Sequence, residues 1–241
     1  MEQIPPHELK RLKAIAGPSK PLDELVERRR AGEPLQYIEG TASFGPLDLF
    51  VDERVLVPRP ETEGLFEVAV RMVRNPRVIV DLCTGSGALA LALKDAFPTA
   101  SVFATDISSE AIEVARINRD RLQLDVRLAV GDLFDPLPAS ILGEVDLLVA
   151  NPPYVAESEY ALLPADVKRE PRAALVAGPT GLEVMEAIGA SASEWLRPGG
   201  VMVMEIGERQ GVSAVSSIVV LTTVVRSDLN GRDRYLVAVK P

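Results

Sequence analysis

Residues 78–97 constrain the fold more than any other stretch of the chain. Residues 78–82 (VIVDL) are an apolar run typical of a buried strand, a glycine-rich turn at 83–87 (CTGSG) follows directly, and residues 88–97 form an apolar helical segment. A strand, a glycine turn and a helix in this order make up the first unit of a Rossmann-like α/β fold, in which small residues let a cofactor approach the backbone. We therefore predict a Rossmann-like sheet with a cofactor site at this turn.

Apolar runs further along the chain predict six more strands. Asn230-Gly231 is a turn signal that would join the last two of them as an antiparallel hairpin. Seven strands ending in such a hairpin resemble the class I S-adenosylmethionine-dependent methyltransferases rather than the nicotinamide dehydrogenases. The six strands are expected at residues 102–105, 126–130, 145–150, 200–206, 218–225 and 235–239.

Two strand ends after the glycine turn carry side chains that suit a nucleoside. Asp106 ends the strand at 102–105 about 20 residues after the turn, where an acid can hold ribose hydroxyls. The next strand leads into Asp132 and Leu133, a carboxylate that can bind an adenine amino group and a side chain that can pack on the ring. No Lys follows the glycines as in a phosphate-binding loop, so a nucleoside triphosphate is not expected.

Residues 151–154 (NPPY) follow the buried strand at 145–150 directly. Two prolines cannot continue the ladder, so these residues lie at the carboxyl tip of the strand, the edge at which open α/β sheets bind ligands. The side-chain oxygen of Asn151 and the carbonyl of Pro152 can accept the two hydrogens of a planar NH2 group, and Tyr154 can cover its face. The motif favours chemistry on an amide or ring-conjugated amine over a plain strand-ending turn.

The chain before residue 61 divides into two short segments. Residues 1–31 form an arm with amphipathic helices at 7–16 and 22–30, which is too short to fold alone and should pack on the later part of the chain. Residues 32–60 form a linking β-hairpin, and residues 61–241 form the catalytic domain. Glu61 or Thr62 can cap the helix that begins there. Arg59 and Glu61 suit either a surface ion pair or a loop folded over a ligand.

Composition narrows the classes of function. Lys and Arg number 26 against 35 Asp and Glu, and a net charge of −9 argues against a broad nucleic-acid footprint. The chain has one cysteine, Cys83, and one histidine, His7, so neither an internal disulfide nor a His/Cys metal cluster is expected. No signal-peptide core or membrane-length apolar run is present, so we expect a cytoplasmic protein that does not bind membranes. Cys83 is interpreted as a small buried filler rather than a nucleophile.

Several longer blocks carry a more specific resemblance, which extends from Gly32 almost to the C-terminus. They are GEPLQYIEG, VLVPRPETE, DLCTGSGALALAL, ATDIS, GDLF, NPPYV, REPRAAL, LRPGGVMVMEIGERQG and DLNGRDRYLVA. Together they resemble the HemK/PrmC family, the release-factor glutamine methyltransferases. The resemblance implies methyl transfer from S-adenosylmethionine to the side-chain amide nitrogen (N5) of the glutamine in the Gly-Gly-Gln motif of class 1 peptide-chain release factors, with S-adenosylhomocysteine as product and no metal.

The resemblance also assigns roles to residues of this chain. Asn151, Pro152 and Tyr154 should be catalytic, and together with Pro153 they should hold the substrate amide. Two departures stand out: the family often has Gly where Cys83 stands, and it usually has a fuller helical domain than the arm at 1–31, a domain that helps engage the release factor. The expected cofactor-binding residues are Asp81, Cys83, Thr84, Gly85, Ser86, Gly87, Asp106, Asp132, Leu133 and Asn151.

Three other functions remain open at this point. An adenine-N6 nucleic-acid methyltransferase would use the same motif, residues 151–154, to bind the NH2 group of adenine. It would also need a basic or aromatic surface to bind its nucleic-acid target. A ribosomal-protein glutamine methyltransferase shares the chemistry, although the PRPETE block favours the release-factor branch. A non-catalytic S-adenosylmethionine-binding protein is a third interpretation, against which the intact residues 151–154 argue.

Overall fold

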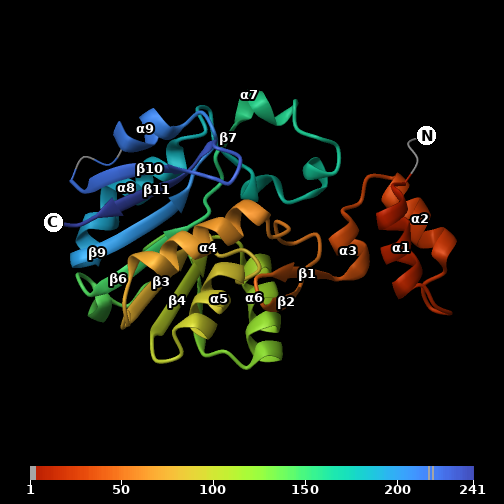
Figure 1. Ribbon diagram of the computed structural model, residues 1–241, viewed down its shortest axis with the longest axis horizontal. Helices are drawn as coiled ribbons and strands as arrows, with labels where there is room; N and C mark the ends of the chain where they lie inside the picture. The colour runs from red at the N-terminus through yellow and green to blue at the C-terminus, as the bar shows by residue number, and fades with distance from the viewer. Residues whose placement is uncertain (1–3, 217, 219) are drawn as a thin grey trace.

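The computed structural model describes residues 4–216, 218 and 220–241. Three short helices and a small hairpin precede a body in which helices and strands alternate (Figure 1). The N-terminal elements are α1 (Pro6–Ile15), α2 (Leu22–Arg30), α3 (Leu35–Glu39), β1 (Thr41–Phe44) and β2 (Leu47–Phe50). The body contains α4 (Pro60–Met72), β3 (Val78–Leu82), α5 (Ala88–Ala96), β4 (Ser101–Asp106), α6 (Ser109–Leu122), β5 (Val126–Val130), η1 (Ala139–Ile141), β6 (Val145–Ala150), β7 (Val155–Ala156), α7 (Glu157–Tyr160), η2 (Val167–Arg169), η3 (Arg172–Ala174), β8 (Val176–Gly178), α8 (Glu183–Trp195), β9 (Leu196–Glu205), α9 (Gly211–Ser216), β10 (Thr222–Ser227) and β11 (Asp233–Val239).

Seven strands form one sheet in the order β10-β11-β9-β6-β3-β4-β5. β11 runs antiparallel to both of its neighbours, and the other neighbouring pairs are parallel. The predicted Rossmann-like seven-stranded sheet with a terminal hairpin is therefore confirmed. The strand expected at 218–225 starts too early, since β10 begins at Thr222. Ile218 and Leu221 are buried in the connection that precedes β10. An apolar run in a sequence does not distinguish such a buried connection from a strand. Residue 219 lies outside the described residues.

The direction in which the sheet grows reverses at β3. The chain builds β4 and β5 on one side of β3 and then crosses to place β6 and β9 on the other. The loops that leave the carboxyl ends of β3 and β6 therefore diverge, and such a switch point is where open α/β sheets bind ligands. The glycine turn and residues 151–154 follow these two strands directly.

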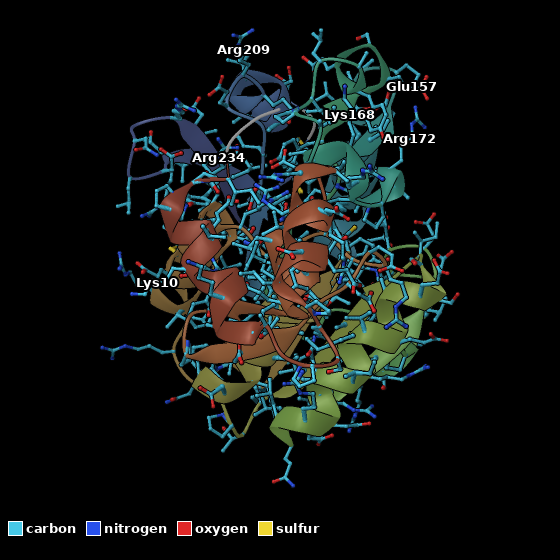
Figure 2. The ribbon with its side chains drawn as sticks, turned by 90° about the vertical axis from the view of Figure 1, so that its right-hand side faces the viewer. Lys10, Glu157, Lys168, Arg172, Arg209 and Arg234 are labelled. Atoms are coloured by element: carbon cyan, nitrogen blue, oxygen red, sulfur yellow. The ribbon has the colours of Figure 1, made fainter. Side chains whose placement is uncertain are left out.

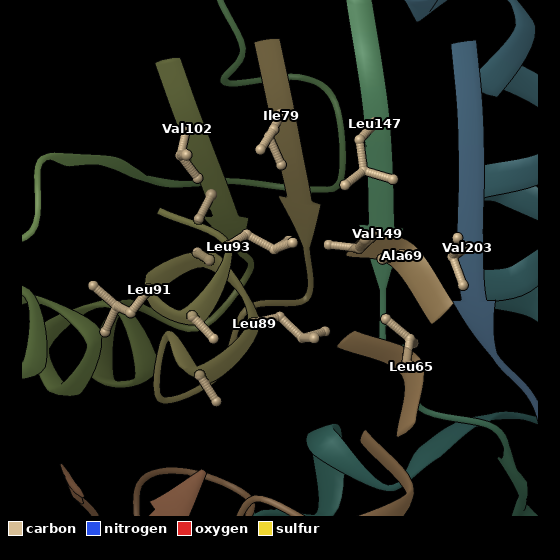
Figure 3. Close-up of a cluster of buried hydrophobic side chains, with 14 of the residues drawn as sticks. Leu65, Ala69, Ile79, Leu89, Leu91, Leu93, Val102, Leu147, Val149 and Val203 are labelled. Carbon is tan, nitrogen blue, oxygen red and sulfur yellow. The ribbon is translucent and has the colours of Figure 1, made fainter. Parts of the chain in front are cut away.

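Helices cover both faces of the sheet. Ile79 of β3 belongs to a cluster with Leu65 of α4 and Leu93 of α5 (Figure 3), whereas Val80, the next residue, belongs to a second cluster with Met185 of α8. Successive strand residues point to opposite faces. Burial on both faces explains why the central strands appear in the sequence as continuous apolar runs rather than as alternating ones.

The N-terminal helices have a small core of their own. α1 and α2 match the two predicted helices, and they lie beside each other at the end of the molecule remote from the sheet (Figure 1). α3 was not predicted, yet its Leu35 and Ile38 pack with Leu12 and Leu25 of the arm. The β1–β2 hairpin turns at Gly45 and Pro46, as expected. The division at residues 31 and 60 stays a prediction.

Among residues 4–216, 218 and 220–241, none of the helices combines the length and the apolar character needed to cross a bilayer.

Candidate functional site

A cleft of about 810 Å³ opens where β3, β4, β5 and β6 end. Asp81, Gly87, Pro152 and Tyr154 are absent from its lining, as far as the described residues show. The loop at 53–58, which the sequence did not assign to the site, forms part of one wall. The predicted site residues that do line the cleft are Cys83, Thr84, Gly85, Ser86, Asp106, Asp132, Leu133, Asn151 and Pro153.

The glycine turn makes the floor of the cleft open to a ligand. Cys83, Gly85 and Gly87 all have left-handed backbone angles, with φ of 58°, 56° and 84°. A Cβ on Gly85 would meet nothing within 4 Å, so this position faces open space beside the cleft. A Cβ on Gly87 would lie 3.2 Å from Leu91 and 3.3 Å from Ala115, so Gly87 allows α5 to approach α6 closely.

Asp81 holds the glycine turn from beneath the cleft. Its side chain is fully buried, and its Oδ2 accepts hydrogen bonds from the Thr84 hydroxyl at 2.6 Å and from the Ala90 backbone N–H at 3.1 Å. Its Oδ1 has no hydrogen-bond partner among the described residues. Burial raises the pKa of Asp81 to about 7. Asp81 therefore shapes the turn without lining the cleft.

Asp106 joins the glycine turn to the start of α6. One carboxylate oxygen accepts the backbone N–H of Gly85 at 2.8 Å, and the other accepts that of Ser108 at 2.9 Å. Burial raises its pKa, while these two hydrogen bonds oppose the rise. Ile107, the next residue, lines the cleft with 67% of its surface exposed. The carboxylate of Asp106 and the apolar side chain of Ile107 thus line the same part of the cleft.

The remaining nucleoside-side residues lie on the loop after β5. Leu133 has a left-handed φ of 42°, and its carbonyl accepts a hydrogen bond from the Thr105 hydroxyl at 2.8 Å. This bond ties the loop to β4.

Burial raises the pKa of the Cys83 thiol, so the thiol stays protonated at neutral pH and is a poor nucleophile.

Asn151 is held from behind by side chains that the sequence did not assign to the site. Its Nδ2 donates to the Thr62 hydroxyl at 3.0 Å, and that hydroxyl donates to Glu205 Oε2 at 2.9 Å. The Tyr154 hydroxyl donates to the other carboxylate oxygen at 3.4 Å. Burial raises the pKa of Glu205 to about 7, although Thr62 and Arg234 act in the opposite direction. A buried carboxylate thus lies behind the reacting end of the cleft.

The segment after residue 154 contributes residues 171–174 and 176 to the lining of the cleft. Arg59 pairs with the buried Glu170 at 2.6 Å, not with Glu61, so of the two alternatives for these residues the surface ion pair is not formed. Thr62 caps no helix either, because the N-cap position of α4 is Arg59, without a side-chain cap bond. The bond between Arg59 and Glu170 brings the block at 170–176 to the cleft, where Arg172 forms part of the rim.

The rim itself is charged. Figure 2 shows Arg172 and Glu157 close together on the segment after β6, and the two side chains pair at 3.4 Å. Arg172 also lies over the ring of Tyr160, 5.2 Å from its centroid. Because both members of the ion pair are more than half exposed, the pair adds little stability and leaves the arginine accessible at the mouth.

One feature of the sequence could have pointed to a residue that sequence reasoning missed. Glu205 ends β9, so it is an acid at the same strand edge as Asp106, and that criterion alone would have included it. Thr62 offers no local signal, because its contact with Glu205 spans 143 positions of the chain. The loop at 53–58 reaches the cleft because Val55 and Val57 pack against α6.

The arrangement suits a nucleoside-bearing ligand next to an amide. The cleft combines an open glycine floor, an acid at Asp106 for hydroxyl groups and apolar walls at Ile107 and Leu133. Asn151 stands at the other side of the switch point with its amide nitrogen already bonded to Thr62. Its side-chain oxygen is therefore the atom free to accept a hydrogen bond from a second substrate.

Comparison with known proteins places the chain among methyltransferases. The model of the family "Methyltransferase small domain" matches residues 65–169. A release factor glutamine methyltransferase from Deinococcus radiodurans is 41% identical over 216 residues, which cover 88% of this chain and 76% of that protein. A ribosomal protein uL3 glutamine methyltransferase from Burkholderia pseudomallei is 42% identical over 202 residues, which cover 78% of this chain and 66% of that protein.

Solved structures share the fold at lower identity. A methyltransferase from Pyrococcus furiosus superimposes with a TM-score of 0.61 at 20% identity, over 82% of this chain and 91% of that one. A 16S rRNA N2 G1207 methyltransferase from T. thermophilus, solved with AdoMet and guanosine, gives a TM-score of 0.58 at 19% identity, over 83% of this chain and 50% of that one. These likenesses support a class I methyltransferase fold.

Proposed function

We propose that this chain, which belongs to the release factor glutamine methyltransferase family, transfers a methyl group from S-adenosylmethionine to the side-chain amide nitrogen of the glutamine in the Gly-Gly-Gln motif of class 1 release factors. The observation that carries the proposal is the position of Asn151 at the switch point, across the cleft from the glycine turn and Asp106. In this proposal Asn151 is the amide-binding group, and Asp106 belongs to the wall that binds the nucleoside. S-adenosylmethionine, when bound, supplies a methyl group activated by its positively charged sulfonium.

The residues of this chain have two tasks in that reaction. Gly85, Asp106 and Leu133 would hold the nucleoside end of the cofactor, and Asn151 and Pro152 would hold the glutamine amide through the side-chain oxygen and the backbone carbonyl. Accepting both N–H bonds while drawing the nitrogen out of the amide plane frees its lone pair for attack. The nitrogen would take the methyl group as the bond between methyl and sulfur breaks, and S-adenosylhomocysteine would leave. No strong general base is needed before transfer, because the nitrogen becomes acidic once it is alkylated and can then lose a proton to water. Positioning of the two reactants can contribute about 7–11 kcal/mol to lowering the barrier.

Transfer of labelled methyl to purified release factors tests the proposal. We expect label on a factor with the native Gly-Gly-Gln loop and none on a factor whose glutamine is replaced by alanine. Ribosomes and total RNA serve as the other acceptors in the same assay. Label on the alanine factor, or label on RNA alone, would contradict the proposed target.

Methylation of a ribosomal protein is the second candidate, because one relative at 42% identity carries the name of a uL3 glutamine methyltransferase. The release-factor assignment is preferred because the Deinococcus radiodurans relative aligns over 88% of the chain, against 78% for the uL3 enzyme. Label on ribosomal protein in place of the factors would reverse this preference.

Replacing Asp106 by alanine should weaken S-adenosylmethionine binding about 10- to 100-fold, since hydrogen bonds to a charged group contribute roughly 1.5–3 kcal/mol. The substitution removes the expected acceptor for the ribose hydroxyls and also the anchor of the Gly85 N–H. Isothermal titration calorimetry measures the change. Asp135→Ala, an exposed acid outside the cleft lining, is the matched control and should bind normally. Equal affinity for the Asp106 variant and the parent protein would remove Asp106 from the cofactor site.

A further inference from the structure

The amide of Asn151 is the last member of a buried hydrogen-bond relay. Asn151 donates to Thr62, and Thr62 donates to Glu205, with separations of 3.0 and 2.9 Å. Thr62 is 4% exposed at the wall of the cleft, and Glu205, behind it, is 1% exposed. Tyr154 donates to the second oxygen of Glu205 at 3.4 Å. The relay thus connects three elements, namely the first turn of α4, the end of β9 and the turn after β6.

The chemistry of the three groups fixes the direction of each hydrogen bond. Burial raises the pKa of Glu205 to about 7, so at pH 8 the carboxylate is ionised and only accepts, and the single hydroxyl proton of Thr62 must point to it. The Thr62 oxygen then has only lone pairs to offer to Asn151. The amide must therefore turn its NH2 group toward Thr62 and its oxygen away from it. The reverse orientation would set two acceptors against each other in a buried place and is disfavoured.

The position of Thr62 is fixed by close packing of α4 on the sheet. A Cβ on Gly64 would clash with the Tyr235 hydroxyl, so the glycine lets the start of α4 approach β11 without displacing that side chain. The same hydroxyl donates to the backbone carbonyl of Glu61 at 2.9 Å. In the sheet, Ala150 pairs with Met204, so the next residues, Asn151 and Glu205, leave neighbouring strand ends together. The Thr62 hydroxyl joins the two side chains, because it accepts from Asn151 and donates to Glu205.

We propose that Thr62 and Glu205 are positioning residues that hold the Asn151 amide in the one orientation in which its oxygen can accept an N–H of the substrate glutamine. This inference rests on the proposed function and deepens it. A reversed Asn151 would present its NH2 group to the NH2 group of the glutamine, and two donors cannot bond to each other. Thr62 and Glu205 thus act through Asn151.

Thr62→Val and Thr62→Ser form the decisive pair of variants. Valine matches threonine in shape but lacks the hydroxyl, so the Asn151 amide loses its hydrogen-bond acceptor and can rotate by 180°. Serine keeps the hydroxyl. We expect Thr62→Val to lower kcat about 100-fold, the effect of a small misplacement in an active site, and to change the Kd for S-adenosylmethionine by less than about twofold. Thr62→Ser should recover most of the activity. Thr223→Val on β10, outside the cleft lining, controls for a general effect of exchanging a hydroxyl for a methyl group.

The assay uses labelled methyl transfer to a native release factor at pH 8, with calorimetry for the cofactor and thermal unfolding for each variant. Wild-type kcat in Thr62→Val, a parallel loss of cofactor affinity, or equal loss in Thr62→Ser would each overturn the positioning role. A parent protein that transfers no label to the factor would instead contradict the proposed function, so the two failures are distinguishable.

Discussion

Replacing Asn151 by alanine should lower the turnover number for release-factor methylation by about 10²–10³-fold, the usual cost of removing one preorganised polar group from an active site. The side-chain oxygen of Asn151 is the acceptor that we assign to the N–H of the glutamine amide. Asn151 lies at the opposite side of the switch point from Asp106 and the glycine turn, so the affinity for S-adenosylmethionine should change little. The Asn151→Ala variant should therefore lose turnover but keep its affinity for S-adenosylmethionine.

Single-turnover methyl transfer and calorimetry measure the two quantities. Asn151→Asp is the informative second variant, because it keeps an oxygen at the tip but replaces the donor to Thr62 with another acceptor. Thr62 has one proton and would then face two carboxylates, so we expect activity between those of the parent and the alanine variant. Asn230→Ala, in the turn before β11, is the matched control and should act normally. If Asn151→Ala turned over at the parent rate, Asn151 would have no part in holding the substrate amide.

The part of the site that local sequence describes well is the part built from consecutive residues. The run at 78–97 predicted a strand, a turn and a helix, and the structure has β3, three left-handed residues in the turn, and α5 in these places. Residues 151–154 were expected at a strand tip, and β6 ends at Ala150. Apolar runs and glycine turns are local signals, so one sequence is enough to recognise them.

The part that could not be predicted depends on contacts between distant positions. Thr62 and Glu205 are 143 positions apart, and Arg59 and Glu170 are 111 apart. The strand order brings the first pair together, because β6 and β9 are neighbours and α4 packs over them. No periodicity within either segment encodes that proximity.

Very short elements were missed for a different reason. α3 has five residues and β7 has two, and such lengths carry too little pattern to be told from a loop. Each is stabilised by its surroundings: α3 by its contacts with the arm, and β7 by pairing with β8, whose first residue, Val176, lines the cleft. The segment after residue 154 therefore carries no clear pattern of its own, although its residues 171–174 and 176 line the cleft.

The contribution of Asp81 to the free energy of unfolding, measured without cofactor, should fall as the pH rises from about 4 to about 7. The pKa of Asp81 is raised to about 7 by burial, whereas an aspartate in an unfolded chain titrates near about 3.9. Between these values the folded protein holds a proton that the unfolded chain has released, so stability decreases with rising pH. At about 1.4 kcal/mol per pKa unit, the loss from Asp81 is on the order of 4 kcal/mol. Glu205 and Glu170, whose pKa values are also raised to about 7, act in the same direction.

Urea unfolding of Asp81→Asn at pH 5 and pH 8 tests this assignment. Asparagine stays neutral, and its oxygen can still accept the bonds from Thr84 and Ala90 while its NH2 group takes the place of the unpartnered Oδ1. The variant should therefore be more stable than the parent at pH 8 and should show a smaller difference between the two pH values. Asp146→Asn is the matched control with the opposite sign: burial raises the pKa of Asp146, but Arg197 and the N–H groups of Val78 and Arg77 outweigh it and lower that pKa, so the loss of its charge should destabilise the protein at pH 8. An Asp81→Asn variant less stable than the parent at pH 8 would mean that the ionised carboxylate is favoured at the base of the glycine turn.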